Sequence, residues 1–148
     1  MKPVRTLVVL ANDREARFLE NDGVGKGLHQ TRHLDREGLV SADIAYAAQP
    51  GRSQAAPGGA RHGMEPSTPE DDQNRARFAA ALAAEVDKAL RKGGYDRLIV
   101  SAPAKMLGAL RAKLPHDAQA KIAADLSKDL IHIPVADLPR HFSAVAAF

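Results

Sequence analysis

The sequence predicts a single α/β domain spanning residues 1–148, in which helices cover both faces of a mixed β-sheet. The chain has 148 residues, which is near the usual size of one domain. Its first part contains short apolar runs separated by turn residues, a pattern typical of an antiparallel hairpin. Its second part alternates apolar runs with patterns of helical period, which favours strands joined by helices.

Three strands are expected first. Residues 5–12, RTLVVLAN, are rich in aliphatic residues and end at the turn residues Asn12 and Asp13. Residues 16–20 alternate in polarity and predict a second strand that pairs with the first as a hairpin. Three glycines up to position 27 predict the next turn. Residues 28–34, LHQTRHL, predict a third strand with an unusually polar outer face.

A long segment without regular periodicity separates these strands from the clearest helix. Residues 35–67 are dominated by Gly, Ala, Ser and Pro, and predict a loop of a length that is usually functional or mobile. Residues 68–71, TPED, then combine an N-cap, a proline at the first helical position and acids in the first turn. Gly93-Gly94 predicts the end of this helix. Its apolar stripe is expected to contain Phe78, Leu82, Val86 and Leu90.

Strands and helices alternate in the last third of the chain. Residues 95–103, YDRLIVSAP, predict a short buried strand, and Ser101 is expected to be the N-cap of the helix that follows. Pro115 predicts the start of another helix, which continues to about Asp125. Residues 130–133, LIHI, predict a last strand, and a short terminal helix is expected from residue 137. The inward face of the helix after the buried strand is expected to contain Met106, Leu107 and Leu110.

The composition excludes several kinds of chemistry. The chain has no cysteine, so it forms no disulfide and has no thiolate nucleophile or thiolate metal ligand. Its six histidines lack a metal-binding spacing, so we expect no metal site and no cofactor. The N-terminal apolar run, residues 7–11, is too short for a signal peptide or a membrane span. We therefore expect a cytoplasmic protein without membrane contact.

The basic residues are concentrated in the second half. The net charge is +3, and residues 75–148 carry 12 basic and 7 acidic residues. This positive surplus belongs either to ordinary solvated surface or to a basic face that binds phosphate. Lys105 is expected in the first turn of a helix that follows a strand, where free amide groups and the helix dipole favour anions. Arg111 and Lys113 lie farther along the same helix and are further candidates for binding an anion. The alternative is that these basic residues are ordinary solvated residues on an exposed helix face.

Asp13 is the carboxylate whose position invites a catalytic interpretation. It follows the first expected strand, and a nuclease would hold Mg²⁺ with carboxylates grouped at such a position. The sequence places no partner carboxylate beside it, which favours a turn-forming role. Ser101 lacks the GxSxG pattern of an activated serine. We therefore expect no catalytic residue, while enzymatic activity stays an open alternative.

Several segments resemble, in order, a bacterial family of host attachment proteins. They are VVLANDREARFLEND, the loop sequences PGR and GGARHGMEP, the helix RARFAAALAAEV, and the segments LIVSAPAKMLGALR and SKDLIHIP. Together they span almost the whole chain, and SAPAKMLGALR is the most specific of them. The resemblance implies a connection with attachment to host cells. Because we expect no signal or membrane segment, that connection would be indirect.

That family is in turn similar to the middle domain of archaeal and eukaryotic peptide-chain release factors. The resemblance implies the same order of hairpin, glycine-arginine loop, long helix and buried strand. In release factors the loop carries a Gly-Gly-Gln tripeptide that enters the peptidyl-transferase centre of the ribosome. Here Gly58-Gly59 is followed by Ala60, so peptide release is not expected. The loop either contacts ribosomal RNA, or is a flexible cover; its candidate contacts are Arg52, Arg61 and His62.

Three functional hypotheses follow. The first is a non-enzymatic, release-factor-like module that binds the ribosome or structured RNA, and the resemblance and the basic second half favour it. The second is a small metal-dependent phosphoesterase or nuclease. The third is a protein-interaction factor with an indirect role in attachment to host cells. The RNA target and the oligomeric state stay open.

Overall fold

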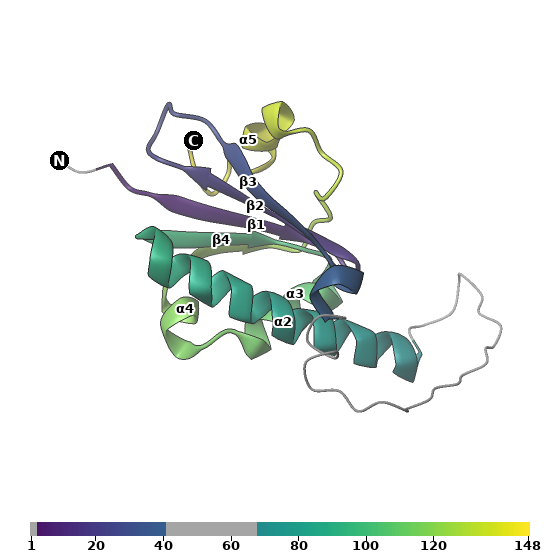
Figure 1. The fold of residues 1–148 in the computed structure, drawn as a ribbon. Helices are drawn as coiled ribbons and strands as arrows, with labels where there is room; N and C mark the ends of the chain where they lie inside the picture. The colour runs from purple at the N-terminus through teal and green to yellow at the C-terminus, as the bar shows by residue number, and fades with distance from the viewer. Residues whose placement is uncertain (1–2, 41–67) are drawn as a thin grey trace.

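A computed structural model describes residues 3–40 and 68–148. These residues form a five-stranded sheet in the order β3-β2-β1-β4-β5 (Figure 1). The first three strands are antiparallel, whereas β1, β4 and β5 run parallel, so the expected mixed sheet is confirmed. The strands are β1 (Thr6–Ala11), β2 (Glu15–Asn21), β3 (His29–Asp35), β4 (Arg97–Ser101) and β5 (Ile122–Leu126).

Strand β1 lies in the middle of the sheet and is buried along its whole length. It pairs with β2 through a tight turn, as the hairpin prediction required, and with β4 on its other side. Because both faces of a central strand are covered, a continuous apolar run is more favourable here than alternation. The run Leu7–Leu10 supplies it.

Strand β3 is the edge strand of the antiparallel part, and most of its side chains are exposed. This agrees with the polar third strand that the sequence predicts. The expected loop at 35–67 begins differently, because residues 36–40 are helical. Asp35 accepts a hydrogen bond from the Gly38 amide at 2.7 Å, and Leu39 and Val40 pack against the core. A local cap and tertiary burial therefore form a helical turn that periodicity did not reveal.

Helix α2 (Pro69–Gly93) follows the sequence prediction closely. Thr68 is its N-cap and forms a capping box with Asp71, and Gly94 ends it in the left-handed conformation at φ 66°. Its buried residues are Phe78, Ala79, Leu82, Ala83, Val86 and Leu90, which form the expected stripe against the sheet.

The region after β4 corrects one prediction. Helix α3 (Ala104–Lys113) ends before Pro115 as expected, but helix α4 (His116–Ala120) is short and does not continue to Asp125. Residues from Ile122 instead form β5, which pairs with β4. An added helical turn would have left the backbone edge of β4 without hydrogen-bond partners, and this cost outweighs local helix propensity.

The second face of the sheet is covered by the C-terminal segment. Residues 130–133 form a turn, in which Ile133 N donates to Leu130 O at 3.1 Å, and the strand predicted there is wrong. The buried side chains of Leu130 and Ile131 nevertheless pack on the sheet. A 3₁₀ turn, η1 (Val135–Asp137), and helix α5 (Leu138–His141) complete the cover, which confirms the short terminal helix.

Two polar side chains of the sheet hold this cover in place. Arg17 of β2 is buried, and its Nη1 donates to the carbonyl oxygens of Ile131 and Ile133 at 2.9 and 2.7 Å. Ser101 Oγ donates to Lys128 O at 2.7 Å. Ser101 is therefore the last residue of β4 and not the N-cap of α3, which is Pro103. Because these carbonyls bind side chains, the segment needs no neighbouring strand.

Figure 1 shows the resulting layers, with α2, α3 and α4 on one face and α5 on the other. Each face has its own apolar core, one centred on Phe18, Phe78 and Leu82, the other on Leu19, Ile99 and Phe142. In the described ranges, no helix has the length and apolar character needed to cross a membrane.

Arg5, directly before β1, joins several segments. Its Nε donates to Asp22 at 3.0 Å, its Nη2 pairs with Glu20 at 3.1 Å, and its Nη1 donates to Gly93 O. Its guanidinium lies over the Tyr95 ring, 4.6 Å from the centroid. The Tyr95 hydroxyl donates to Glu20 at 2.7 Å, and burial together with this hydrogen bond raises the pKa of Tyr95 to about 12. Arg5 thus connects the start of β1 to the end of β2 and to the end of α2.

Leu82→Ala is expected to lower the free energy of unfolding by about 2–4 kcal/mol, because it removes packing from a fully buried site and leaves a cavity. Chemical denaturation measures the difference. Gln73→Ala, at an exposed position of α2, is the control and should change stability by less than about 0.5 kcal/mol. An unchanged midpoint for Leu82→Ala would show that the buried face is assigned wrongly.

Arg17→Met is expected to lower stability by about 2–4 kcal/mol, because one buried and one partly buried carbonyl oxygen lose a charged donor while the aliphatic packing remains. Hydrogen exchange should also become faster in residues 130–142. Arg77→Met, on the exposed face of α2, is the matched control. Unchanged exchange in the C-terminal segment would contradict the anchoring role of Arg17.

Candidate functional site

A shallow pocket lies where the end of β1 meets the start of α3. Its volume is about 470 Å³. One wall is the turn between β1 and β2, the second is the turn between β4 and α3, and α2 contributes a single arginine. The carboxyl ends of neighbouring parallel strands are common ligand sites in α/β proteins. The lining residues are Asn12, Asp13, Arg14, Arg75, Pro103, Ala104, Lys105 and Met106.

The first wall is shaped by Asn12. Its side-chain oxygen accepts hydrogen bonds from the backbone amides of Arg14 and Glu15, both at 2.8 Å. Its backbone amide donates to Glu15 O at 3.0 Å. This arrangement is an Asx turn, so the turn predicted at Asn12 and Asp13 is confirmed. The turn holds Asp13 and Arg14 at the mouth of the pocket.

Asp13 forms a two-pronged ion pair with Arg75 of α2. Arg75 Nε lies 3.2 and 3.1 Å from the two carboxylate oxygens, and Nη2 lies 3.0 Å from one of them. Arg75 also pairs with Asp72 at 2.8 Å, and its side chain is 11% exposed. The hydrogen bond to Asp13 is the largest contribution that raises the pKa of Arg75, while burial opposes it. The charge of Asp13 is therefore compensated within the pocket.

The second wall is the N-terminus of α3. Its N-cap, Pro103, makes no side-chain hydrogen bond to the first turn, and that turn contains no acidic residue. The Ser101 hydroxyl, which could have capped the helix, binds Lys128 O instead. Among the described residues, no side chain caps the first amide groups of α3, so these groups and the positive end of the helix dipole are available at the pocket.

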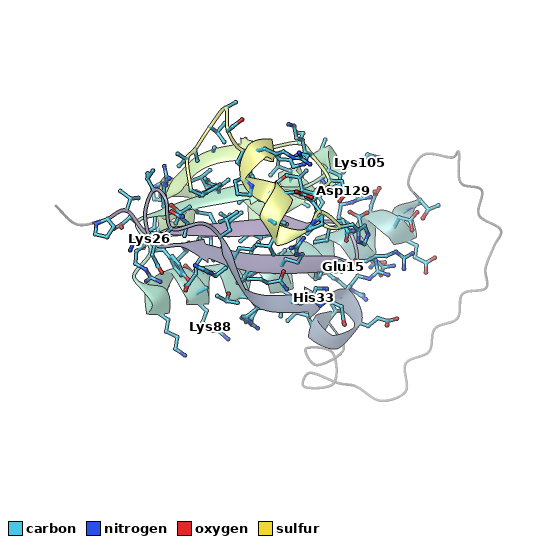
Figure 2. The ribbon with its side chains drawn as sticks, turned by 90° about the horizontal axis from the view of Figure 1, so that it is seen from above. Glu15, Lys26, His33, Lys88, Lys105 and Asp129 are labelled. Carbon is cyan, nitrogen blue, oxygen red and sulfur yellow. The ribbon has the colours of Figure 1, made fainter. Side chains whose placement is uncertain are left out.

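Basic side chains dominate the mouth of this pocket. Arg14 is exposed, and its guanidinium makes no hydrogen bond or ion pair with any residue in the described part of the chain. Lys105 is exposed at the second position of α3 (Figure 2). Together with Arg75, the described residues that line the pocket include three cationic side chains and one carboxylate. Its electrostatic character favours an anion.

The structure separates the RNA-binding residues that the sequence predicts. Lys105 lines the pocket, as the strand-to-helix junction suggested. Arg111 pairs with Asp125 of β5 at 2.9 Å, and Lys113 is the last residue of α3, about 12 Å from Lys105 along the helix axis. Three further candidates lie outside the described residues: Arg52, Arg61 and His62.

Two pocket residues were missed from the sequence. Arg14 adjoins the turn at Asn12 and Asp13, so its position beside the strand end was a usable signal. Arg75 carried no such signal, because it meets Asp13 across 62 positions of sequence. From the sequence, a solvated basic residue on an amphipathic helix cannot be distinguished from one that pairs with a distant segment.

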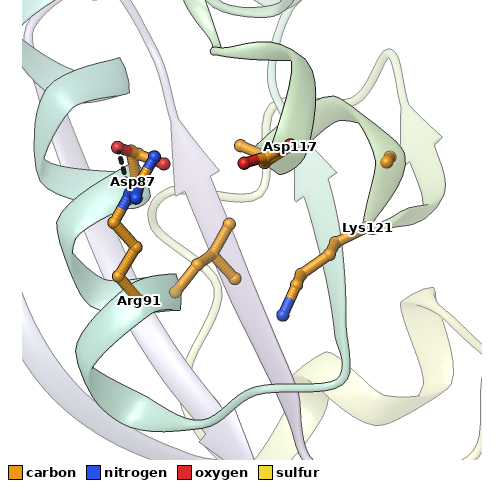
Figure 3. A pocket seen from close by; sticks show the side chains of 7 residues that line it. Asp87, Arg91, Asp117 and Lys121 are labelled. Atoms are coloured by element: carbon orange, nitrogen blue, oxygen red, sulfur yellow. Dashed lines mark hydrogen bonds and ion pairs between the residues drawn. The ribbon is translucent and has the colours of Figure 1, made fainter.

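A second hollow lies between α2 and α4, and its volume is about 350 Å³ (Figure 3). Its floor includes Leu90, and Asp87, Arg91, Asp117 and Lys121 border it. Both of its cations have partners, because Arg91 pairs with Asp87 at 2.9 Å and Lys121 Nζ donates to Tyr95 O at 2.8 Å. The described lining of this hollow has two carboxylates for two cations, whereas that of the pocket beside Asp13 has one carboxylate for three, so the latter is the better anion site.

Metal-binding side chains are not grouped within residues 3–40 and 68–148, where no three His, Cys, Asp or Glu residues are placed to share an ion. Asp13 and Asp72 do approach each other through Arg75, which pairs with both. The arrangement as it stands is an arginine held by two carboxylates.

The model of bacterial archaeo-eukaryotic release factor family 12 matches residues 5–142. The chain belongs to this family. The match includes both walls of the pocket, and it confirms the release-factor-like character expected from the sequence. No curated protein matched this family 12 chain.

Two solved structures illustrate the similarity. An archaeal protein matches with a TM-score of 0.45 and 12% identity, over 95% of this chain and 37% of that one. The archaeal translation termination factor aRF1 matches with a TM-score of 0.44 and 11% identity, over 85% of this chain and 31% of that one. The family 12 chain thus spans about a third of the length of each.

The pairing of Asp13 with Arg75 is expected to stabilise the pocket by about 1 kcal/mol, because one partner is largely buried and the other is partly exposed. A double-mutant cycle with Asp13→Asn and Arg75→Gln, followed by chemical denaturation, measures this coupling. Asp117→Asn, at an exposed site, is the control for loss of a carboxylate. A coupling energy of zero would mean that the pair does not organise the pocket.

Proposed function

We propose that this family 12 protein binds ribosomal or other structured RNA through the pocket beside Asp13, without catalysing peptide release. The observation that carries the proposal is the meeting of Arg14, Arg75 and Lys105 with the uncapped N-terminus of α3. Phosphate is the anion that RNA presents along its whole length. Membership of a release-factor-like family supports the ribosome as the source of that RNA.

The proposed phosphate contact combines rigid backbone amides with adaptable basic side chains. The amides of the first turn of α3 have fixed directions and bind one phosphate oxygen without side-chain entropy loss. Arg14 and Lys105 approach from the two sides of the mouth and adapt to the RNA backbone. Asp13 holds Arg75 in place and compensates its charge. Arg75 therefore shapes the pocket more than it attracts the phosphate.

Other basic groups extend the proposed surface. Arg111 and Lys113 would contact phosphates farther along the RNA from the end of α3, although Arg111 would first have to leave Asp125. The predicted loop residues Arg52, Arg61 and His62 remain part of the proposal on the basis of the sequence. We infer no peptide release, because Ala60 follows Gly58-Gly59 where release factors carry glutamine. A role on the ribosome would place the protein in the cytoplasm.

Two alternatives have narrower support. A metal-dependent phosphoesterase or nuclease would use Asp13, which would have to exchange Arg75 for a metal ion. An indirect role in attachment to host cells rests on the resemblance of the segments quoted above to host attachment proteins. Both remain hypotheses beside the RNA-binding proposal.

The test is co-sedimentation with ribosomes and binding to ribosomal RNA at several salt concentrations. Replacing both Arg14 and Lys105 with Ala should weaken binding at least tenfold and reduce the log–log salt slope by about two, one for each phosphate contact. Replacing Arg52 and Arg61, or Arg111 and Lys113, shows whether the loop or the far end of α3 contributes as well.

Lys26→Ala with Arg140→Ala is the control of equal charge loss, since both side chains are exposed and neither lines the pocket. Equal weakening by this control would reduce the interaction to general attraction. Cleavage of RNA that requires Mg²⁺ or Mn²⁺ and is abolished by Asp13→Asn would replace the proposal with the nuclease alternative.

A further inference from the structure

A further hollow lies between α2 and the antiparallel edge of the sheet, at the end of β1 opposite the Asp13 pocket. Its volume is about 310 Å³, at the lower limit of typical ligand cavities. Its floor is apolar and contains Leu7, Phe18 and Tyr95. Its mouth is bordered by Arg32 of β3 and by Lys88 and Lys92 of α2. Lys88 and Lys105 lie well apart in Figure 2, so the two hollows are separate.

The mouth of this hollow has a positive surplus. Glu85 accepts from Arg32 at 2.9 Å and from Lys88 at 3.4 Å, so one carboxylate serves two cations. These contacts hold the pKa of Glu85 below its usual value despite partial burial. Lys92 has no ion pair or hydrogen bond from its side chain within the described ranges. The surface therefore complements a negatively charged partner.

The floor argues against a nucleic-acid base as the occupant. Stacking needs an open ring face. Phe18 and Tyr95 are only 1% and 7% exposed, and guanidinium groups already lie over both rings, Arg32 at 5.5 Å and Arg5 at 4.6 Å from the centroids. An apolar side chain needs no ring face and can pack against Ala89 and the aliphatic stems of Lys88 and Lys92, which also line the hollow.

The adjacent strand offers a backbone template. Within the described residues β3 pairs with β2 on one edge and with no strand on the other. The amide and carbonyl groups on an unpaired edge can bind an extended peptide as an added strand. Alternate side chains of such a peptide would point to the same face as Arg32, towards the hollow.

We propose that β3 and this hollow form a docking site for an extended acidic segment of a partner protein. The segment adds a strand to the edge of β3 that no described strand occupies, and packs an apolar side chain against Ala89 at the mouth of the hollow. Its carboxylates pair with Arg32, Lys88 and Lys92. This site and its partner are distinct from the RNA-binding pocket, and neither proposal depends on the other.

The first test measures fluorescence anisotropy with a labelled octapeptide of alternating Glu or Asp and Val or Leu. Wild-type protein should bind it at least tenfold more tightly than a peptide with Lys in place of every acid. Replacing both Lys88 and Lys92 with Gln should weaken binding at least tenfold. Lys128→Gln with Arg140→Gln removes the same charge at two exposed positions elsewhere and should have little effect.

The second test addresses the backbone. Two further peptides carry N-methyl groups on one or the other set of alternating residues, which removes the amide donors on one edge. One of these peptides should lose binding and the other should keep it, and the amide resonances that shift in the wild-type protein should include those of β3. Shifts confined to other elements, or equal effects of both methylated peptides, would overturn strand addition.

The remaining outcome concerns the class of partner. If a ten-nucleotide oligouridine binds, the acidic peptide does not, and the Lys88 and Lys92 substitutions abolish RNA binding, then the hollow is a nucleic-acid site and the proposal is wrong. Ribosome binding that depends on Arg14 and Lys105 should be unchanged by the Lys88 and Lys92 substitutions, so the two proposals fail separately.

Discussion

The fold depends on β1 pairing on both of its edges. An antiparallel partner on one side and a parallel partner on the other bring the hairpin at the start of the chain against the strands that follow α2. A strand in this position has no solvent-facing side, which explains why every residue from Thr6 to Ala11 is buried. Arg5 at its start and the Asp13–Arg75 pair at its end then lock α2 onto the strand.

The two faces of the sheet are covered by different physical means. On one face, α2 and α3 supply regular apolar stripes, and burial of these stripes is sufficient. On the other, an irregular segment has backbone carbonyls that no helix or strand satisfies. Arg17 and Ser101 donate to the carbonyl oxygens of Ile131, Ile133 and Lys128 from within the sheet, so these oxygens are hydrogen-bonded while the segment keeps its apolar contacts.

The same architecture places two basic hollows at opposite ends of the helical face. In the pocket beside Asp13, the cations meet an uncapped helix start and a turn, so directed backbone donors are available for phosphate. In the hollow beside β3, the cations lie around an apolar floor and beside a strand edge with which no described strand pairs. Because different groups accompany the positive charge in the two hollows, different partners are proposed for them.

The sequence alone determined the elements whose signals are local. The capping residues and stripe of α2, the turn at Asn12, and the place of Lys105 in the first turn of α3 depend on residues a few positions apart. The tertiary structure decided what depends on distant partners. Ile122 joins a strand because β4 offers an unpaired edge, residues 130–133 turn because Arg17 binds their carbonyls, and Arg75 reaches Asp13 across 62 positions. Such hydrogen bonds and ion pairs outweigh local propensity, and their partners are set by the folded chain and not by neighbouring residues.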